Sequence, residues 1–319
     1  MKKSKKPIIK HLPDYLDWID IEKGLASSTQ ENYARFLKRF FKWLEKHDLT
    51  SLLPHELTEK HVWDYRIFLA RKTKHENSDK NLEKSTQQYY LIGLRSLLSY
   101  FAARDITSLP PEKIELPKTR NEKEIRFLNL DQVRRLFDAP DVSKDIGLRD
   151  RAILETLFST GMRISELVAL NRDQIESSLD KEGLELSIIG KGSKARTVYF
   201  SPRALEWLRK YLKSRDDMAE ALFINYRAPS DASRRLTARS IQKKIKKYAI
   251  KAGLPTNTTP HVLRHSFATD LLGRGVDIRI LQEFLGHSSI TATQIYAHVT
   301  SKQLKDIHRE YHGGNDLEK

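Results

Sequence analysis

Six polar side chains in the second half of the chain are of the types that transfer a phosphoryl group. On a phosphodiester, this reaction needs a nucleophile, positive charge around the phosphorus centre and a proton donor for the leaving alkoxide. A tyrosine, two arginines, a lysine and two histidines cover these tasks between them. They are Arg163, Lys191, His261, Arg264, His287 and Tyr296.

Each residue type suits one part of the reaction. Arginine donates paired hydrogen bonds to phosphate oxygens and keeps its charge, so Arg163 and Arg264 are candidates to clamp the transition state. Lys191 stands between two glycines and is a candidate general acid. Tyrosine, whose ordinary pKa is about 10, needs a base or a positive field to act as a nucleophile, and histidine supplies the base.

Each of these residues, taken singly, has a more ordinary interpretation. A lone histidine is more often a hydrogen-bonded structural residue, and Tyr296 alone would more often lie at the edge of a core. A lysine in a turn and an arginine at a helix start are usually solvated. Only the occurrence of all six together favours catalysis.

A histidine pair four residues apart, His261 and His265, also resembles the zinc-binding pair of metalloproteases. However, Val262 stands where that motif has glutamate, and Arg264 between the histidines would repel a dication. We therefore expect no metal. The stretch 190–192 lacks the spacing of a phosphate-binding P-loop, so we expect no nucleotide or other cofactor.

The chain has 319 residues and a formal net charge of +15, from 57 Lys and Arg against 42 Asp and Glu. Residues 1–110 hold 20 basic and 14 acidic residues, and residues 111–319 hold 37 and 28. Both parts are therefore basic. This charge favours a polyanionic partner, either nucleic acid or an anionic membrane surface, and suits a clamp with two faces.

Cysteine is absent, which excludes a thiol nucleophile, disulfides and zinc sites with cysteine ligands. No stretch approaches the roughly 18 apolar residues of a membrane span, and no apolar run of a secretory signal follows the basic N-terminus. We expect a cytoplasmic protein without membrane insertion. The lysines at 2–6 are expected to form a frayed, solvated end.

The spacing of apolar residues predicts mainly α-helix with a small β-sheet. In the first part of the chain, Ser28 and Ser85 are each expected to begin a capping box. The helices form a bundle over 10–107, and the three prolines of 108–124 predict an interdomain linker. The expected helices of this part are 14–21, 25–44, 58–70 and 85–100.

A second domain is expected over 125–312. One of its helices ends at Gly161, which would let the side chain of Arg163 point into a cleft. Strand-like stretches at 184–189 and 197–200 flank a glycine-containing bend and predict a β-hairpin. Helices are expected over 130–137, 148–158, 162–170, 204–212, 236–252 and 260–269.

Basic residues on these helices are candidates for contacts with a phosphate backbone, although a charged helix face is often only solvated. The candidates are Arg35, Lys38, Arg39, Arg95, Lys243, Lys244, Lys246 and Lys247.

Five short motifs follow one another in the second part of the chain: residues 160–167, 190–194, 261–269, 285–289 and 293–296. In content, order and spacing they resemble the motifs of the tyrosine recombinases, closest to the Xer branch. A single His-x-x-Arg motif would be a weak signal, whereas all five in order are specific. The resemblance is strong over 125–312 and weak over 10–107.

The resemblance implies a SAM-like four-helix core-binding domain ahead of an α-rich catalytic domain with a β-hairpin sheet. It implies that Tyr296 attacks a DNA phosphodiester and forms a 3′-phosphotyrosyl bond, leaving a free 5′-hydroxyl. Arg163 and Arg264 would stabilise the transition state, and Lys191 would protonate the leaving oxygen.

For the remaining positions, the resemblance implies supporting roles. His261 would exchange a proton with the tyrosine, His287 would hydrogen-bond the phosphate, and Glu166 would hold part of the site together. Neither ATP nor metal is required, because the covalent link conserves the energy of the broken bond.

The implied partner is a double-stranded DNA recombination site, bound by a homo- or hetero-tetramer on two such sites. The C-terminal helix, expected over 298–311, would be exchanged between subunits, and activation by a translocase stays open. Chromosome dimer resolution is the leading role. Integration of a mobile element and a catalytically silent DNA-binding accessory role are alternatives, and a type IB topoisomerase fits the motifs less well.

Overall fold

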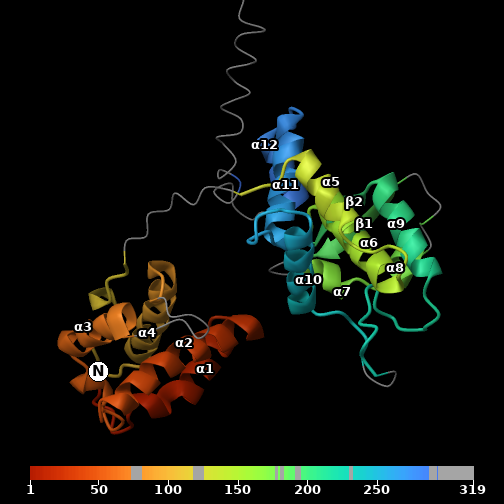
Figure 1. Ribbon diagram of the computed structural model, residues 1–319. Helices are drawn as coiled ribbons and strands as arrows, with labels where there is room; N and C mark the ends of the chain where they lie inside the picture. Colours follow the sequence, from red (N-terminus) through yellow and green to blue (C-terminus); the bar gives the residue numbers. More distant parts are fainter. Residues whose placement is uncertain are drawn as a thin grey trace, which may run out of the picture. The chain divides into compact units, whose positions relative to one another are not determined.

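The chain folds into two compact units, Met1–Lys123 and Glu124–Lys319, each with its own hydrophobic core (Figure 1). The computed structural model describes residues 1–72, 81–117, 126–176, 179, 183–190, 195–229, 233–286 and 293.

The described part of the first unit is helical, and the four helices expected from the sequence are present. Short 3₁₀ and π-helical turns join them. In chain order the elements are η1 (Ile8–His11), α1 (Leu12–Ile21), α2 (Ser27–Lys46), η2 (Pro54–Glu56), α3 (Glu59–Ile67), η3 (Phe68–Lys72), α4 (Lys84–Ala103) and η4 (Pro111–Lys113).

The predicted capping boxes at Ser28 and Ser85 are wrong. Helix α2 starts after Ala26 and α4 after Glu83, and neither N-cap residue makes a side-chain cap. Instead, the glutamine of each Ser-Thr-Gln sequence reaches back to a carbonyl before its helix. Gln30 Nε2 donates to Leu25 O at 2.7 Å, and Gln87 Nε2 donates to Leu82 O at 2.8 Å.

Helices α2 and α4 lie side by side and form the centre of this unit (Figure 1). Gly93 of α4 allows the close approach, because a Cβ at this position would lie 2.7 Å from Cβ of Phe36 on α2. The Phe36 ring stacks on Tyr89 with centroids 5.8 Å apart. The interface therefore depends on the missing side chain at Gly93.

The expectation of a frayed N-terminus is wrong at Lys2. Its backbone forms a parallel bridge with Ile106: Lys2 N–H donates to Asp105 O at 2.6 Å, and Thr107 N–H donates to Lys2 O at 3.0 Å. The N-terminal segment is therefore tied to the chain that follows α4. Lys6 is also paired, with Asp14 at 2.6 Å.

The second unit contains the expected β-hairpin and the expected helices up to residue 269, while the helix expected over 298–311 lies outside the described residues. Two short helices, α8 and α12, were not expected. The elements are α5 (Leu130–Asp138), α6 (Asp145–Thr160), α7 (Ile164–Ala169), α8 (Asp173–Glu176), β1 (Leu184–Ile189), β2 (Ala195–Phe200), α9 (Pro202–Lys213), α10 (Ala238–Lys251), α11 (Pro260–Gly273) and α12 (Ile278–Leu285).

Helix α6 is the central element of the second unit, because it contacts both α9 and α11 (Figure 1). Strands β1 and β2 pair antiparallel, with Leu184 opposite Phe200 and Ile189 opposite Ala195. Strand β2 contacts both α6 and α12. Among the residues that the structure describes, no helix is both long and apolar enough to cross a membrane.

We predict that Gly93→Ala destabilises the first unit by about 1–3 kcal/mol, because the added methyl group forces α2 and α4 apart. Thermal unfolding followed by tryptophan fluorescence measures this, since Trp18, Trp43 and Trp63 lie in that unit. Gly273→Ala in α11 is the control for a methyl group added to a helical glycine without close neighbours: a Cβ there has nothing within 4 Å, and Trp207 reports the unfolding of that second unit. Equal effects of the two substitutions would contradict the packing argument.

Candidate active site

The structure describes four of the expected site residues, namely Arg163, Glu166, His261 and Arg264. Lys191, His287 and Tyr296 lie outside the described residues. The four described residues come from two places in the sequence, the start of α7 and the first turns of α11.

Arg163 follows directly on a helix break, as expected. Helix α6 ends at Gly161 in the left-handed conformation with a φ of 58°, and Arg163 is the N-cap of α7. The carboxylate of Glu166, in the first turn of α7, accepts the backbone N–H of Arg163 at 2.8 Å and its Nη1–H at 3.0 Å. Glu166 thus holds both the backbone and the guanidinium of Arg163.

Helix α11 supplies the other pair. Thr259 caps its N-terminus through a side-chain bond to the N–H of Val262, and Pro260 occupies the first turn. His261 and Arg264 are three residues apart and therefore share a face of the helix. Arg264 is buried and donates from Nη1 to Gly161 O at 2.6 Å and from Nη2 to Leu285 O.

The end of α12 connects these residues. Its last turn packs on α11, with Leu281 and Leu285 in one apolar cluster with Ala268 and Leu272. Three consecutive carbonyls then accept hydrogen bonds from three arginines: Phe284 O from Arg196, Leu285 O from Arg264 and Gly286 O from Arg163. The C-terminal carbonyls of a helix are otherwise unpaired and carry partial negative charge, so they suit cations.

Arg196 of β2 is a site residue that the sequence motifs do not include. It binds Glu166 with both ends of its fork, Nη1 to Oε1 at 2.8 Å and Nη2 to Oε2 at 2.7 Å. Alternation along β2 places Arg196 on the same face as Val198 and Phe200, both buried. An arginine on the apolar face of a strand needs a partner, and this signal was available in the sequence.

Burial and the charges around the site together shift the pKa values of its titratable groups. Burial acts to raise the pKa of Glu166, but hydrogen bonds from Arg196 and from the backbone of Arg163 outweigh it, and the pKa is lowered. Desolvation, with the positive charges of Arg264 and Arg163, lowers the pKa of His261. Desolvation, His261 and Arg264 lower the pKa of His265 to about 4. Both histidines are therefore neutral at pH 7.

The histidine pair considered as a metal site is not completed by a third ligand within the described residues. These contain no group of three or more His, Cys, Asp and Glu side chains able to hold a metal ion. Arg264 stands between His261 and His265 on α11 and lowers the pKa of each. The arrangement therefore places cationic donors and a neutral imidazole together, which suits a phosphate group.

Comparison with known proteins assigns the family. Residues 126–303 match the phage integrase family, and residues 14–108 match the phage integrase N-terminal SAM-like domain. A tyrosine recombinase XerD of Lacticaseibacillus casei is 34% identical over 308 residues, 94% of this chain and 98% of the relative. One of Pseudomonas putida is 33% identical over 314 residues, 96% and 99% of the two chains.

The chain belongs to the phage integrase family. It is a tyrosine recombinase, a site-specific DNA recombinase, and the resemblance to the Xer branch is confirmed.

Solved structures show the same fold. XerH bound to a palindromic difH substrate, in a post-cleavage complex, matches with a TM-score of 0.73 and 21% identity, over 96% of this recombinase and 97% of that chain. A lambda integrase dimer bound to a COC′ core site matches with a TM-score of 0.67 and 17% identity, over 91% and 77%. The expected fold class is therefore confirmed.

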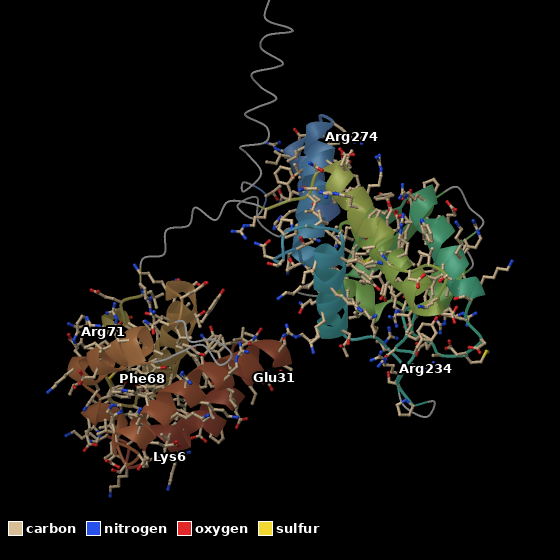
Figure 2. The ribbon with its side chains drawn as sticks, viewed as in Figure 1. Lys6, Glu31, Phe68, Arg71, Arg234 and Arg274 are labelled. Carbon is tan, nitrogen blue, oxygen red and sulfur yellow. The ribbon has the colours of Figure 1, made fainter. Side chains whose placement is uncertain are left out.

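The basic candidates in the first unit differ in their surroundings. Arg35, Lys38 and Arg95 are exposed. Arg39 is half-buried, and its guanidinium carbon lies 5.9 Å from the centroid of the Phe68 ring in η3, which is labelled in Figure 2. Arg39 is therefore partly engaged within its own unit.

The lysine run of α10 divides in the same way. Lys243, Lys246 and Lys247 are exposed on the face opposite the buried Ile241 and Ile245. Lys244 is directed inward, because its ammonium group pairs with the buried carboxylate of Asp150 on α6 at 2.7 Å. Desolvation lowers the pKa of Lys244. Its expected role as a DNA contact conflicts with this position, because its ammonium group is engaged by a carboxylate that Arg149 also binds.

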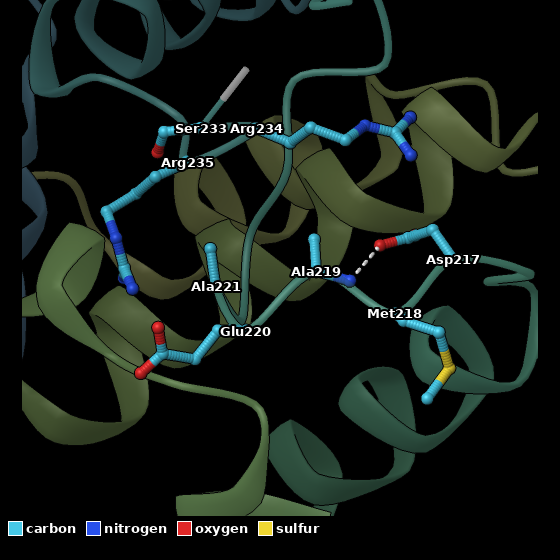
Figure 3. A pocket seen from close by; sticks show the side chains of 8 residues that line it. All are labelled: Asp217, Met218, Ala219, Glu220, Ala221, Ser233, Arg234 and Arg235. Carbon is cyan, nitrogen blue, oxygen red and sulfur yellow. Dashed lines mark hydrogen bonds between the residues drawn. The ribbon is translucent and has the colours of Figure 1, made fainter. Parts of the chain in front are cut away.

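A pocket of about 580 Å³ is not lined by Arg163, Glu166, His261 or Arg264 (Figure 3). Its lining residues belong to the segment between α9 and α10 and include Asp217, Glu220, Arg234 and Arg235. One hydrogen bond inside it joins the N–H of Ala219 to Asp217 Oδ1 at 2.9 Å. The described motif residues lie outside its lining, so this pocket is separate from the catalytic candidates.

We predict that, in a pH titration followed by NMR of the imidazole groups, His265 titrates at about pH 4 and His261 below pH 6.5. Because the folded-state pKa of His265 lies below the unfolded value, the stability it contributes is present above pH 6.5 and is lost as the pH falls toward 4.

Arg163→Met provides an internal comparison. It removes one of the charges that lower the pKa of His261 and none of those that lower the pKa of His265. The midpoint of His261 should rise while that of His265 stays constant. A wild-type midpoint for His261 at or above 6.5 would contradict the electrostatic description of the site.

Proposed function

We propose that this recombinase cuts and rejoins duplex DNA at a specific site through a 3′-phosphotyrosyl intermediate formed by Tyr296. The observation that carries the proposal is the convergence of Arg163 and Arg264, which are 101 positions apart in the sequence. They donate to the adjacent carbonyls of Gly286 and Leu285, so both guanidinium groups lie at one helix end. Two cations held this close suit a single phosphate.

In the proposed reaction, a phosphorus–oxygen bond to the DNA is replaced by a phosphorus–oxygen bond to Tyr296. The phenolic oxygen of Tyr296 attacks the phosphorus atom, the bond from phosphorus to the 5′-oxygen breaks, and Lys191 protonates that oxygen. Neutral His261 takes the phenolic proton, which agrees with its lowered pKa. Arg163 and Arg264 bind the non-bridging oxygens as charge develops, and His287 donates to the phosphate. No metal and no ATP enter these steps.

Glu166 acts through its neighbours. Its carboxylate is 5% exposed and is occupied by Arg163 and Arg196, so it does not contact substrate. Its role is to hold the guanidinium of Arg163 at the start of α7. Rejoining is the reverse reaction, in which a 5′-hydroxyl attacks the phosphotyrosyl bond and Tyr296 recovers its proton.

The biological role proposed is resolution of chromosome dimers in the cytoplasm by a homo- or hetero-tetramer on two DNA sites. Relatives named tyrosine recombinase XerD, which align over 93–96% of this chain, support the Xer branch over a mobile-element integrase. The proposal includes exchange of the C-terminal helix between subunits and activation by a translocase. The domains it uses are 10–107 for clamping DNA, 108–124 as linker and 125–312 for catalysis.

We predict that the wild-type protein forms a covalent adduct with a nicked suicide substrate carrying its recognised site, while Tyr296→Phe binds the same DNA and forms none. Binding-site selection first identifies the DNA, and a denaturing gel detects the adduct. The released strand should carry a 5′-hydroxyl. Binding by both proteins with no adduct on any selected site would support an accessory DNA-binding role instead.

We also predict that the exposed lysines of α10 contribute to DNA binding through counterion release. Replacing Lys243, Lys246 or Lys247 with glutamine should reduce the slope of log K against log salt by about 0.9 for each phosphate that is no longer neutralised. Lys244→Gln is the matched control on the same helix. It should leave the slope unchanged and lower the melting temperature, because Oδ2 of the buried Asp150 loses the ammonium group of Lys244 and only Arg149, on Oδ1, still pairs with that carboxylate. The same slope change for all four would contradict the assignment.

A further inference from the structure

The side chain of Arg196 is enclosed and bonded at all three nitrogens. It is 9% exposed, and its Nη1 and Nη2 bind the two oxygens of Glu166 at 2.8 and 2.7 Å. Its Nε donates to the carbonyl of Phe284 in the last turn of α12 at 3.3 Å. One side chain of β2 thus joins the start of α7 to the end of α12.

We propose that Arg196 is a positioning residue for DNA strand cleavage, which orients the guanidinium of Arg163 by fixing Glu166 and the end of α12. This inference rests on the function proposed for Arg163. It goes beyond that function by assigning a role to a residue outside the five motifs that identify the family's catalytic groups.

The carboxylate of Glu166 is shared between Arg196 and Arg163. A buried carboxylate next to a single arginine would take both ends of its fork, because that bidentate pair is the strongest arrangement available. Here Arg196 occupies both oxygens, and Arg163 makes one side-chain bond to Glu166, from Nη1 to Oε1 at 3.0 Å. The fork of Arg163 is thereby kept from closing on Glu166, and its side chain stays 25% exposed.

Arg196 and Arg163 both bind the C-terminal end of α12. Arg163 Nη2 donates to Gly286 O at 3.2 Å, two residues beyond the carbonyl that Arg196 holds. One contact of Arg163 is therefore to a carboxylate that Arg196 also binds, and the other is to the helix end that Arg196 also holds. A shift of either Glu166 or the α12 end would turn the guanidinium of Arg163.

The missing side chain at Gly286 leaves room for Arg196. Gly286 has a φ of 60°, and a Cβ on it would lie 2.5 Å from Cδ and 3.0 Å from Nε of Arg196. Absence of a side chain at Gly286 lets the arginine pass beside the turn. A residue with a side chain at position 286 would be strained at this φ and would also clash with Arg196.

Arg196→Lys tests the assignment, because lysine keeps the positive charge but cannot make the two parallel bonds to Glu166 together with the bond to Phe284. In single-turnover cleavage of the suicide substrate, the rate constant should fall about 10²-fold, as expected for a misplaced catalytic group. The dissociation constant for DNA should change less than about twofold, since Arg196 does not face substrate.

Arg215→Lys is the matched control. Arg215 is also buried, binds Asp217 with both ends of its fork and donates to carbonyls at Ala219, Ala221 and Leu222. These bonds stay within the segment that follows α9, so its replacement should lower the melting temperature and leave the cleavage rate unchanged. Equally reduced cleavage in both variants would show that general stability, and not Arg196, controls the rate.

A double substitution separates positioning from direct contact. If Arg196 acts through Glu166, then Arg196→Lys should have little further effect on cleavage in a Glu166→Gln background. Multiplying effects would overturn the part of the assignment that runs through Glu166 and would leave the bond to Phe284 as the only route from Arg196 to Arg163. An Arg196→Lys variant that keeps the wild-type melting temperature but no longer binds DNA would also overturn the assignment, because Arg196 would then act in DNA binding.

The outcomes distinguish this assignment from the function on which it rests. Wild-type protein that forms no adduct on any selected site would overturn the proposed cleavage activity and the assignment with it. Wild-type protein that forms the adduct, with Arg196→Lys cleaving at the same rate, would overturn the assignment alone.

Discussion

The site depends on the binding of three guanidinium groups by three consecutive carbonyls at the end of α12. Three like charges within one short turn repel each other, and free carbonyls at a helix end lack donors. The carbonyls therefore offset the repulsion while the arginines supply the donors, and Glu166 offsets further positive charge. Because the arginines come from the start of α7, from β2 and from α11, the same contacts fix the positions of these elements relative to the end of α12.

Burial, together with this concentration of charge, lowers the pKa of His261. Positive groups near an imidazole disfavour its charged form, and Arg264 and Arg163 both act in that direction on His261. A histidine kept neutral by its neighbours is able to accept a proton at physiological pH. In the proposed reaction the same charges stabilise an incoming phosphate, so one cluster would both keep His261 neutral and attract the substrate. The net charge of +15 extends that attraction over the molecule.

The sequence was sufficient for most of the described helices, for the hairpin and for the position of Arg163 after a helix break, because apolar periodicity and residue type carry that information. It was insufficient where backbone groups act, since the carbonyls of Phe284, Leu285 and Gly286 have no residue-specific signature. The ion pair of Lys244 has no signature in the local sequence, because its partner Asp150 is 94 residues away. The capping boxes expected at Ser28 and Ser85 are absent. Gln30 and Gln87 instead donate to carbonyls ahead of their helices, which start at 27 and 84, and a capping-box pattern does not describe this arrangement.

The choice of arginine over lysine at these positions follows from the number and geometry of donors. A guanidinium has five N–H groups in a plane, whereas an ammonium group has three on one atom. Arg163 can bond Glu166 through one nitrogen and Gly286 through another and still present donors of the same fixed plane to a phosphate. Arg196 bonds the protein through all three nitrogens. The two arginines on Glu166 therefore have different roles: Arg196 holds the carboxylate, and the carboxylate holds Arg163 in an orientation that leaves donors for substrate.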